Sequence, residues 1–174
     1  AETHPSPYNT REHFMMIGNL MHAPNLDSVR WCKEAIWPLI RKQIPTAELH
    51  IYGSYGDKYH TELHNPDRGI HMKGRANDAA QTMRHYRINL APLRFGAGLK
   101  GKVLDGLVTG TATIASPYAA EGMNGKIDWG CPITDNPTEF ADTAVRVYKD
   151  SHTWSRVQQQ GFEIIRQRFN PKQW

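Results

Sequence analysis

The residues best suited to chemistry in this 174-residue chain lie in the segment 89–110, which reads NLAPLRFGAGLKGKVLDGLVTG. An apolar run typical of a strand ends there in a turn rich in glycine and positive charge, and the apolar spacing of a helix follows. Backbone amides at the start of a helix attract anions, glycine permits close approach of the main chain, and lysine adds charge. Lysines in the first turn of a helix oppose its dipole, so a bound anion would remove that conflict. The segment therefore predicts a binding site for a phosphorylated ligand.

Asp105 is placed to contribute to this site. Gly98, Lys102 and Asp105 are four and three residues apart, so on a helix that starts near Gly98 they share one face. A carboxylate there can accept hydrogen bonds from both hydroxyls of a ribose. An isolated helical aspartate more often pairs with a nearby lysine, but the glycines and lysines around Asp105 favour the ribose.

The rest of the chain alternates between strand and helix patterns. This alternation predicts an α/β fold, a Rossmann-like three-layer sandwich with a mainly parallel sheet covered on both faces. Ligands of such sheets bind at the carboxyl ends of the strands, where the glycine-containing turns fall. We expect Pro38 to distort the helix that contains it, and residues 117–131 to form a loop. The expected strands are 14–17, 48–52, 70–73, 87–92, 112–116 and 132–134, and the expected helices are 27–41, 57–63, 78–85, the segment from the glycine turn to 110, 137–148 and 151–169.

Length and composition favour one domain, with residues 1–12 as a tail or linker and 13–174 as the folded part. No apolar stretch approaches the ~20 residues of a transmembrane helix, and nothing at the start resembles a signal peptide. The chain begins with Ala1 rather than methionine, which indicates a piece of something longer. Cys32 and Cys131 lack the spacing of zinc ligands, which favours a reducing, cytoplasmic location and no structural zinc.

The distribution of charge gives little support to nucleic-acid binding. The net charge is +4, from 21 Lys and Arg against 17 Asp and Glu, and the two signs are interspersed. Segment 83–87 (MRHYR) interleaves basic and aromatic residues as a single-strand binding surface would, but the end of a helix explains the same cations. His50, His60, His64 and His71 show no spacing typical of a metal site, so we expect no bound metal.

Five segments, taken in chain order, resemble a known family. They read GNLMHAPNLDSVRW, AELHIYGSY, KGRAND, NLAPLRFGAGLKGKVLDGL and AAEGM. They resemble the donor-binding, C-terminal half of the glycosyltransferase group 1 family, retaining enzymes of the two-Rossmann-domain GT-B type. The resemblance extends from Phe14 to Phe169, and its most specific part is the APLRFGAGLKGK turn with AEGM downstream.

The resemblance implies a function and a set of partners. Such a domain binds a nucleotide-diphosphate sugar as the donor, and a separate N-terminal domain, not contained in this sequence, binds the acceptor. The sugar is then transferred with retention of anomeric configuration, without a bound metal or other cofactor. Any contact with a membrane is expected through that N-terminal domain.

The resemblance also assigns roles to single residues. Backbone amides of the glycine turn would contact the diphosphate and the sugar, and its cations would neutralise phosphate charge. Arg75 would lie near the base or phosphates, Asp105 would hold the ribose, and Lys102 and Arg94 would carry catalysis. The family often has two glutamates where this chain has Ala97 and Asp105, so the identity of the sugar stays open. The amide positions are Phe95, Gly96, Ala97, Gly98 and Leu99, and the cations are Arg94, Lys100 and Lys102.

Two alternative functions stay open. Gly96, Gly98 and Gly101 spell GxGxxG, and Glu121 follows twenty residues after the last glycine, as in NAD-binding domains. In those domains the motif follows the first strand, whereas this turn follows the fourth predicted strand. The other alternative is a module that binds a sugar nucleotide without turning it over. Within the main hypothesis, Glu121 would face the cleft, and His22 would either contact a phosphate or cap the helix after it.

Overall fold

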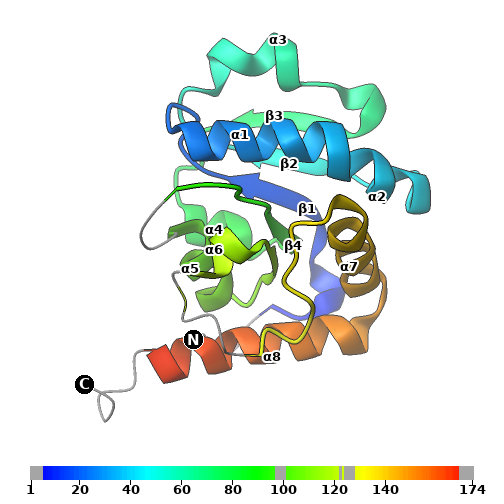
Figure 1. The fold of residues 1–174 in the computed structure, drawn as a ribbon, viewed down its shortest axis with the longest axis vertical. Helices are drawn as coiled ribbons and strands as arrows, with labels where there is room; N and C mark the ends of the chain where they lie inside the picture. Colours follow the sequence, from blue (N-terminus) through cyan, green and yellow to red (C-terminus); the bar gives the residue numbers. More distant parts are fainter. Residues whose placement is uncertain (1–5, 97–100, 122, 124–127, 169–174) are drawn as a thin grey trace.

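The computed structural model describes residues 6–96, 101–121, 123 and 128–168. Its centre is a sheet of five parallel strands in the order β3-β2-β1-β4-β5 (Figure 1). This arrangement confirms the predicted Rossmann-like α/β fold. The strands are β1 (Glu12–Ile17), β2 (Leu49–Tyr52), β3 (Ile70–Gly74), β4 (Tyr86–Ala91) and β5 (Ala112–Ala115).

Helices cover both faces of this sheet and complete the three layers (Figure 1). The α-helices are α1 (Ala23–Trp31), α2 (Trp37–Gln43), α3 (His60–Leu63), α4 (Ala79–Met83), α5 (Gly101–Val108), α6 (Pro117–Glu121), α7 (Pro137–Lys149) and α8 (Ser151–Arg168). The π-helical turn η2 (Cys32–Ile36) joins α1 to α2, and the shorter 3-10 turns are η1 (Tyr8–Thr10), η3 (Gly56–Tyr59) and η4 (Pro66–Arg68).

The main core lies between the sheet and the layer that contains α1, α2 and α7 (Figure 1). Phe14 and Met16 of β1, with Leu49 and Ile51 of β2, point into it and pack with Trp37 of α2. These side chains alternate along each strand because successive residues of a strand face opposite sides of the sheet. The alternation therefore leaves His50 and Tyr52 of β2 on the other face, where they are only partly buried.

The opposite face of the sheet is covered around β4 and β5. Ala91 and Ala115 end these strands and pack with Leu107 of α5 and Ile164 of α8 in a second cluster. α5 is buried on this side through an apolar face, as its sequence pattern predicts. The start of α5, and with it Lys102, is thereby held at the carboxyl ends of the central strands.

The first long helix is divided, as expected from Pro38, although it begins earlier than predicted. α1 starts at Ala23 with Pro24 in its first turn, a position where proline costs no hydrogen bond. The helix then passes through η2 just before Pro38, which occupies the first turn of α2. Proline lacks a backbone N–H, so the widened turn adjusts the hydrogen-bond ladder in front of it.

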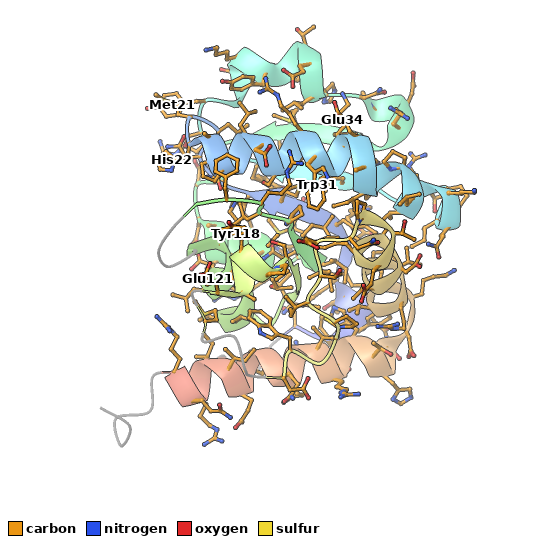
Figure 2. The ribbon with its side chains drawn as sticks, in the orientation of Figure 1. Met21, His22, Trp31, Glu34, Tyr118 and Glu121 are labelled. Atoms are coloured by element: carbon orange, nitrogen blue, oxygen red, sulfur yellow. The ribbon has the colours of Figure 1, made fainter. Side chains whose placement is uncertain are left out.

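Two predictions around β5 were wrong. Residues 132–134 lie in irregular structure and form no strand, and part of the predicted loop folds as α6. Ser116 is the signal that was missed, because its hydroxyl accepts a hydrogen bond from the Ala119 amide and Pro117 follows it. Tyr118 and Glu121 of this short helix lie at the surface (Figure 2).

The last residues of the predicted tail pack on the domain. The Arg11 guanidinium is buried and donates hydrogen bonds to the Thr109 carbonyl at 2.8 Å and the Thr111 hydroxyl at 2.9 Å. The Tyr8 hydroxyl donates to the Tyr148 carbonyl at 2.7 Å. The domain boundary at residue 13 stays a prediction, but residues 8–12 contribute to the fold. Among the described helices, none combines the length and apolar character that a membrane span requires.

Candidate functional site

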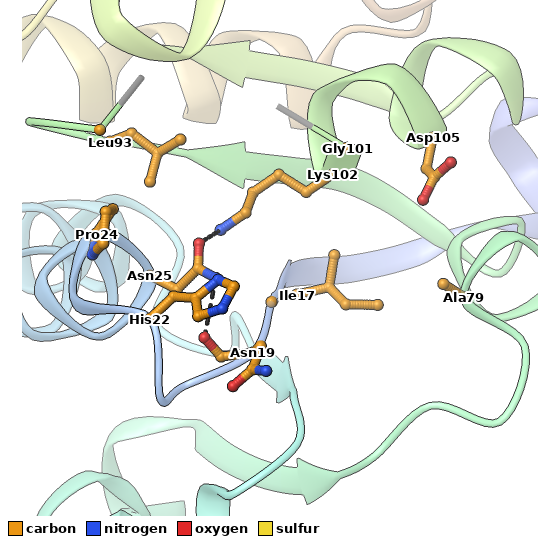
Figure 3. A pocket seen from close by; sticks show the side chains of 12 residues that line it. Ile17, Asn19, His22, Pro24, Asn25, Ala79, Leu93, Gly101, Lys102 and Asp105 are labelled. Carbon is orange, nitrogen blue, oxygen red and sulfur yellow. Dashed lines mark hydrogen bonds between the residues drawn. The ribbon is translucent and has the colours of Figure 1, made fainter. Parts of the chain in front are cut away.

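A pocket of about 460 Å³ lies at the carboxyl ends of the central strands (Figure 3). In the order β3-β2-β1-β4-β5 the strands after β1 are added first on one side of it and then, from β4, on the other. Ligands of parallel sheets bind at this switch point. The pocket opens there, between the first turns of α1 and α5. Its lining residues are Ile17, Gly18, Asn19, His22, Pro24, Asn25, Ala79, Leu93, Gly96, Gly101, Lys102 and Asp105.

Lys102 supplies the positive charge of this pocket. Its Nζ donates a hydrogen bond to Asn25 Oδ1 at 2.5 Å, and Asn25 in turn donates to the Asn19 carbonyl at 2.9 Å (Figure 3). Burial lowers the pKa of Lys102 to about 8. Among the described residues, no carboxylate forms an ion pair with this amine. Lys102 is half-buried, and a cation withdrawn from water without a counter-ion is disfavoured, so the pocket favours the binding of an anion.

The backbone adds to this preference for anions. The N-terminal turns of α1 and α5 both face the pocket, and the N-terminus is the positive end of a helix dipole. Gly18, which follows β1, allows the close approach of side chains, because an added Cβ atom would lie 2.9 Å from Lys102 Nζ. The site thus combines two helix ends with one amine.

Asp105 lies on the same side of α5 as Lys102 and lines the same pocket (Figure 3). The predicted common face of these two residues is confirmed. Partial desolvation raises the pKa of the Asp105 carboxyl, so a donor group from a ligand would favour its charged form. Gly98, the third residue predicted on this face, lies outside the described residues, together with Ala97, Leu99 and Lys100.

Arg94 does not line the pocket. Its guanidinium makes a two-point ion pair with Asp27 of α1, with Nε 2.9 Å from Oδ2 and Nη2 2.6 Å from Oδ1. It also lies over the ring of Trp31 at 5.0 Å. Arg94 therefore fastens the glycine turn to α1. Phe95 follows it at the surface, 41 % exposed, and Gly96 lines the pocket with a positive φ of 114°.

Arg75 lies at a second, smaller pocket of about 250 Å³ at the ends of β2 and β3. That pocket is also lined by Tyr55, Asp57 and the glycines that end these strands. The predicted site residues are therefore divided between two neighbouring strand ends. Glu121, at the end of α6, is exposed and lines neither pocket.

Sequence reasoning named His22 as a possible phosphate contact but missed Asn25 of α1. Asn25 holds Lys102, although the two residues are 77 positions apart in the chain. His22 precedes α1 and lines the pocket, and its side chain makes no capping hydrogen bond. The signal that points to this helix start is Pro24, since proline favours the first turn of a helix.

Comparison with known sequences now identifies the family. Residues 11–150 match the family described as Glycosyl transferases group 1. This chain belongs to that family. The matched residues include both helix ends of the main pocket, Lys102 and Asp105. The comparison with curated proteins finds no match.

Solved structures show the GT-B glycosyltransferase fold at low sequence identity. TarM from S. aureus, a mutant form in complex with Fondaparinux, alpha-GlcNAc-glycerol and UDP, has a TM-score of 0.75 at 14 % identity, covering 99 % of this chain and 36 % of that one. Anabaena HepE, in complex with UDP and glucose, has a TM-score of 0.66 at 12 % identity, covering 94 % of this chain and 50 % of that one. This group 1 chain therefore spans half or less of those two proteins.

A third structure matches over nearly its whole length. The C-terminal domain of the group 1 protein LpcC from Francisella tularensis has a TM-score of 0.65 at 17 % identity, covering 91 % of this chain and 87 % of that domain. This confirms the predicted likeness to a C-terminal group 1 domain.

Proposed function

We propose that this chain is the domain of a retaining glycosyltransferase that binds the nucleotide-diphosphate sugar. The diphosphate would bind at the N-terminal turns of α1 and α5 against Lys102, and Asp105 would hold the ribose. One observation carries the proposal: a lysine amine without a counter-ion lies between two helix ends at the switch point of a parallel sheet. TarM and HepE were solved with UDP, so UDP is the first ligand to test.

The chemistry follows from where charge develops. When the bond between the sugar and the diphosphate breaks, the leaving phosphate gains negative charge and the sugar becomes oxocarbenium-like. Lys102 and the helix amides lie fixed in the pocket, where they would stabilise that charge better than water does. No step of this proposal uses a bound metal ion or another cofactor.

Arg94 and Arg75 take different parts in this proposal. Arg94 already pairs with Asp27, so we propose that it holds the glycine turn in the position that catalysis needs. Arg75 would contact the base from the second pocket. Ala97, Gly98, Leu99 and Lys100 complete the proposed amide and cation set.

An acceptor-binding domain is the remaining partner that we propose. Met21 and Phe95, 65 % and 41 % exposed, are chain neighbours of pocket-lining residues. Exposed apolar side chains beside a binding site are typical of a surface that another domain covers. Transfer to an acceptor would then require both domains.

Calorimetric titration with UDP tests the proposal on the chain itself. We expect Lys102→Ala to bind UDP about ten- to hundredfold more weakly, because a hydrogen bond to a charged group contributes ~1.5–3 kcal/mol. Lys149→Ala, which removes an exposed lysine of α7, is the matched control and should bind like the parent. Tighter binding of NAD than of UDP would instead support a dinucleotide-binding domain and refute ours.

A further inference from the structure

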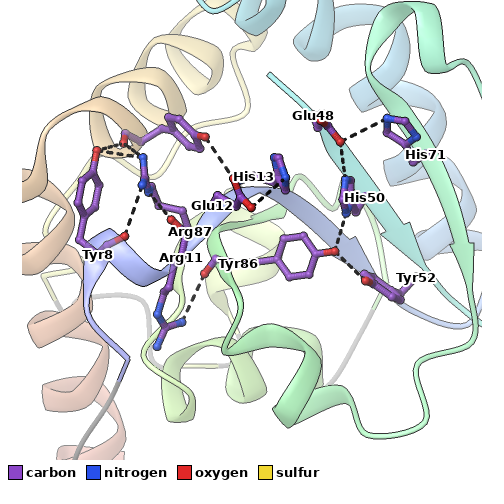
Figure 4. Close-up of polar contacts among 11 residues, drawn as sticks. Tyr8, Arg11, Glu12, His13, Glu48, His50, Tyr52, His71, Tyr86 and Arg87 are labelled. Atoms are coloured by element: carbon purple, nitrogen blue, oxygen red, sulfur yellow. Dashed lines mark hydrogen bonds and ion pairs between the residues drawn. The ribbon is translucent and has the colours of Figure 1, made fainter. Parts of the chain in front are cut away.

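A cluster of metal-binding side chains lies near the amino ends of the strands, whereas the nucleotide pocket lies at their carboxyl ends (Figure 4). We call His13, Glu48, His50 and His71 the histidine cluster. The sheet explains why they meet: Phe14 pairs in register with Leu49, which places His13 beside Glu48, and His50 pairs with His71. Because strand residues two apart share a face, Glu48 and His50 point to the same side.

The distances within the cluster suit a metal ion. One ligand atom each from His13, Glu48 and His50 lies within 4.8 Å of the others. Glu48 Oε1 is 2.9 Å from His50 Nε2 and 3.5 Å from His71 Nε2. Ligand atoms of a tetrahedral zinc ion lie ~3.3 Å apart, given metal–ligand bonds of ~2.0–2.1 Å. Small rotations of His13, Glu48 and His50 would therefore bring their ligand atoms to coordinating distance, and His71, already close to Glu48, would have to turn toward the same point.

The second ring nitrogen of His50 has the partner that metal-bound histidines need. Nδ1 is 2.6 Å from the Tyr86 hydroxyl, and this hydroxyl is 2.7 Å from that of Tyr52 (Figure 4). Without a metal, Nε2–H donates to Glu48 and Nδ1 accepts from Tyr86. With a metal on Nε2, the proton resides on Nδ1 and is donated to the Tyr86 oxygen, which is the usual support for a histidine ligand. The hydroxyls of Tyr86 and Tyr52 can each donate or accept, so they can pair with His50 whether its proton lies on Nε2 or on Nδ1.

His13 occupies a backbone conformation that its packing must stabilise. It has a positive φ of 66° within β1, which is uncommon for a residue other than glycine. Its ring lies against that of His50, with the two centroids 4.8 Å apart. Strained residues persist where the surroundings hold them, and they concentrate at functional sites.

We propose that the histidine cluster binds one zinc-like divalent transition-metal ion through His13, Glu48 and His50, with His71 as the fourth ligand. Three imidazoles and one carboxylate give a mixed nitrogen and oxygen set that suits zinc and disfavours calcium or magnesium. The ion would join β1, β2 and β3 and so stabilise this half of the sheet. The sequence predicted no metal site here, because ligands from three strands leave no spacing pattern.

The test uses the chain without a histidine tag, first treated with EDTA. We expect calorimetry with zinc chloride to show one equivalent bound, and Co²⁺ to give the intense visible absorption of a four-coordinate site. His50→Ala and Glu48→Gln should each weaken binding at least ~100-fold, and Tyr86→Phe by ~10-fold or more. Zinc should also raise the melting temperature of the parent chain and leave that of His50→Ala unchanged.

Controls separate this site from adventitious binding. His152→Ala removes an exposed histidine of α8 and should bind zinc like the parent. UDP titration of each variant reports whether the fold persists, and its outcome does not depend on the metal. The proposal is wrong if zinc fails to bind at micromolar concentration, or if His60→Ala abolishes binding while His50→Ala keeps it.

Discussion

Lys102 of α5 and Asn25 of α1 are joined by a hydrogen bond of 2.5 Å across the mouth of the main pocket. The contact connects the two helix ends that we propose to hold a diphosphate. It uses the neutral oxygen of an amide, which orients the amine without neutralising it. The positive charge of Lys102 therefore remains available to bind an anionic ligand.

Replacing this amide oxygen with a charged one should impair binding. In Asn25→Asp a carboxylate would pair with Lys102 and repel the diphosphate, a cost of ~1–4 kcal/mol for like charges about 4 Å apart. We expect UDP to bind about ten- to hundredfold more weakly in calorimetry. Asn25→Ala is the control, and it should change the affinity by less than ~3-fold. Equal affinities for Asn25→Asp and the parent would show that the diphosphate binds elsewhere.

Binding of UDP should weaken as the pH rises through about 8, the pKa to which burial lowers Lys102. A diphosphate prefers the protonated amine, which is fully present at about pH 7 and about tenfold scarcer at pH 9. We expect about a tenfold loss of affinity between those two values. In Lys102→Arg, whose charge persists at all of these pH values, the profile should be flat. A parent profile as flat as that of the arginine variant would contradict the role of Lys102.

Removing the charge of Lys102 should stabilise the empty domain. The pKa falls from the ordinary 10.5 to about 8 on folding, so the unfolded chain binds more protons and stability increases with pH between these values. Below about pH 8 the charged amine costs stability. The side chain is only partly buried, so this cost is well below the full value of the shift.

Lys102→Met should therefore melt about 2–4 °C higher than the parent near pH 7, the change expected for ~1 kcal/mol in a domain of this size. Adding UDP should raise the melting temperature of the parent only. Lys149→Met, in which an exposed lysine is removed, controls for the general effect of losing a charge. A lower melting temperature for Lys102→Met would contradict the proposed cost.

Arg94→Ala should affect UDP binding far less than Lys102→Ala does. Arg94 is paired with Asp27 outside the pocket lining, and an exposed ion pair contributes only ~0–1 kcal/mol. We expect less than about a threefold change in affinity. Asp27→Asn, which breaks the same pair from the other side, should behave alike. A loss as large as that of Lys102→Ala would show that Arg94 contacts the diphosphate directly.

A glycosyltransferase assay of the full protein that contains this chain would test catalysis. There we expect Lys102→Ala to lower kcat by ~10²–10³, the usual cost of removing one donor to a developing oxyanion. NMR of the product would report retention or inversion at the anomeric carbon. Inversion would overturn the retaining mechanism but leave the donor site intact.

Much of the fold could be predicted from the sequence because the strands are short apolar runs closed by glycine. The helices expected from 78 and 137 are present, and the side chains of Asp78 and Asn136 cap them by accepting amide hydrogen bonds. α6 was missed because Ser116 was predicted to end a strand and Pro117 to begin a loop. The start of α1 was placed too late because Pro24 suggests a turn as readily as a first helical residue.

Of the candidate site, the sequence could predict the part that α5 supplies but not the contact with Asn25 of α1. Lys102 and Asp105 share a helix, so their spacing places both on one face. Asn25 belongs to another helix, and no local pattern predicts its contact with Lys102. The same holds for the histidine cluster, whose members come together only through the register of neighbouring strands.

Gly18 and Gly53 touch where β1 and β2 end, and a Cβ atom on Gly53 would lie 2.1 Å from the Gly18 carbonyl oxygen. Gly18 lines the larger pocket and Gly53 the smaller one. The boundary between the two pockets at Gly18 and Gly53 is thus formed by main-chain peptide groups. A side chain introduced at Gly53 would collide with the Gly18 carbonyl oxygen, so substitution there cannot add a new functional group without moving the main chain. A new donor preference would therefore have to evolve, or be engineered, in the surrounding rim residues such as Asn19 and His22.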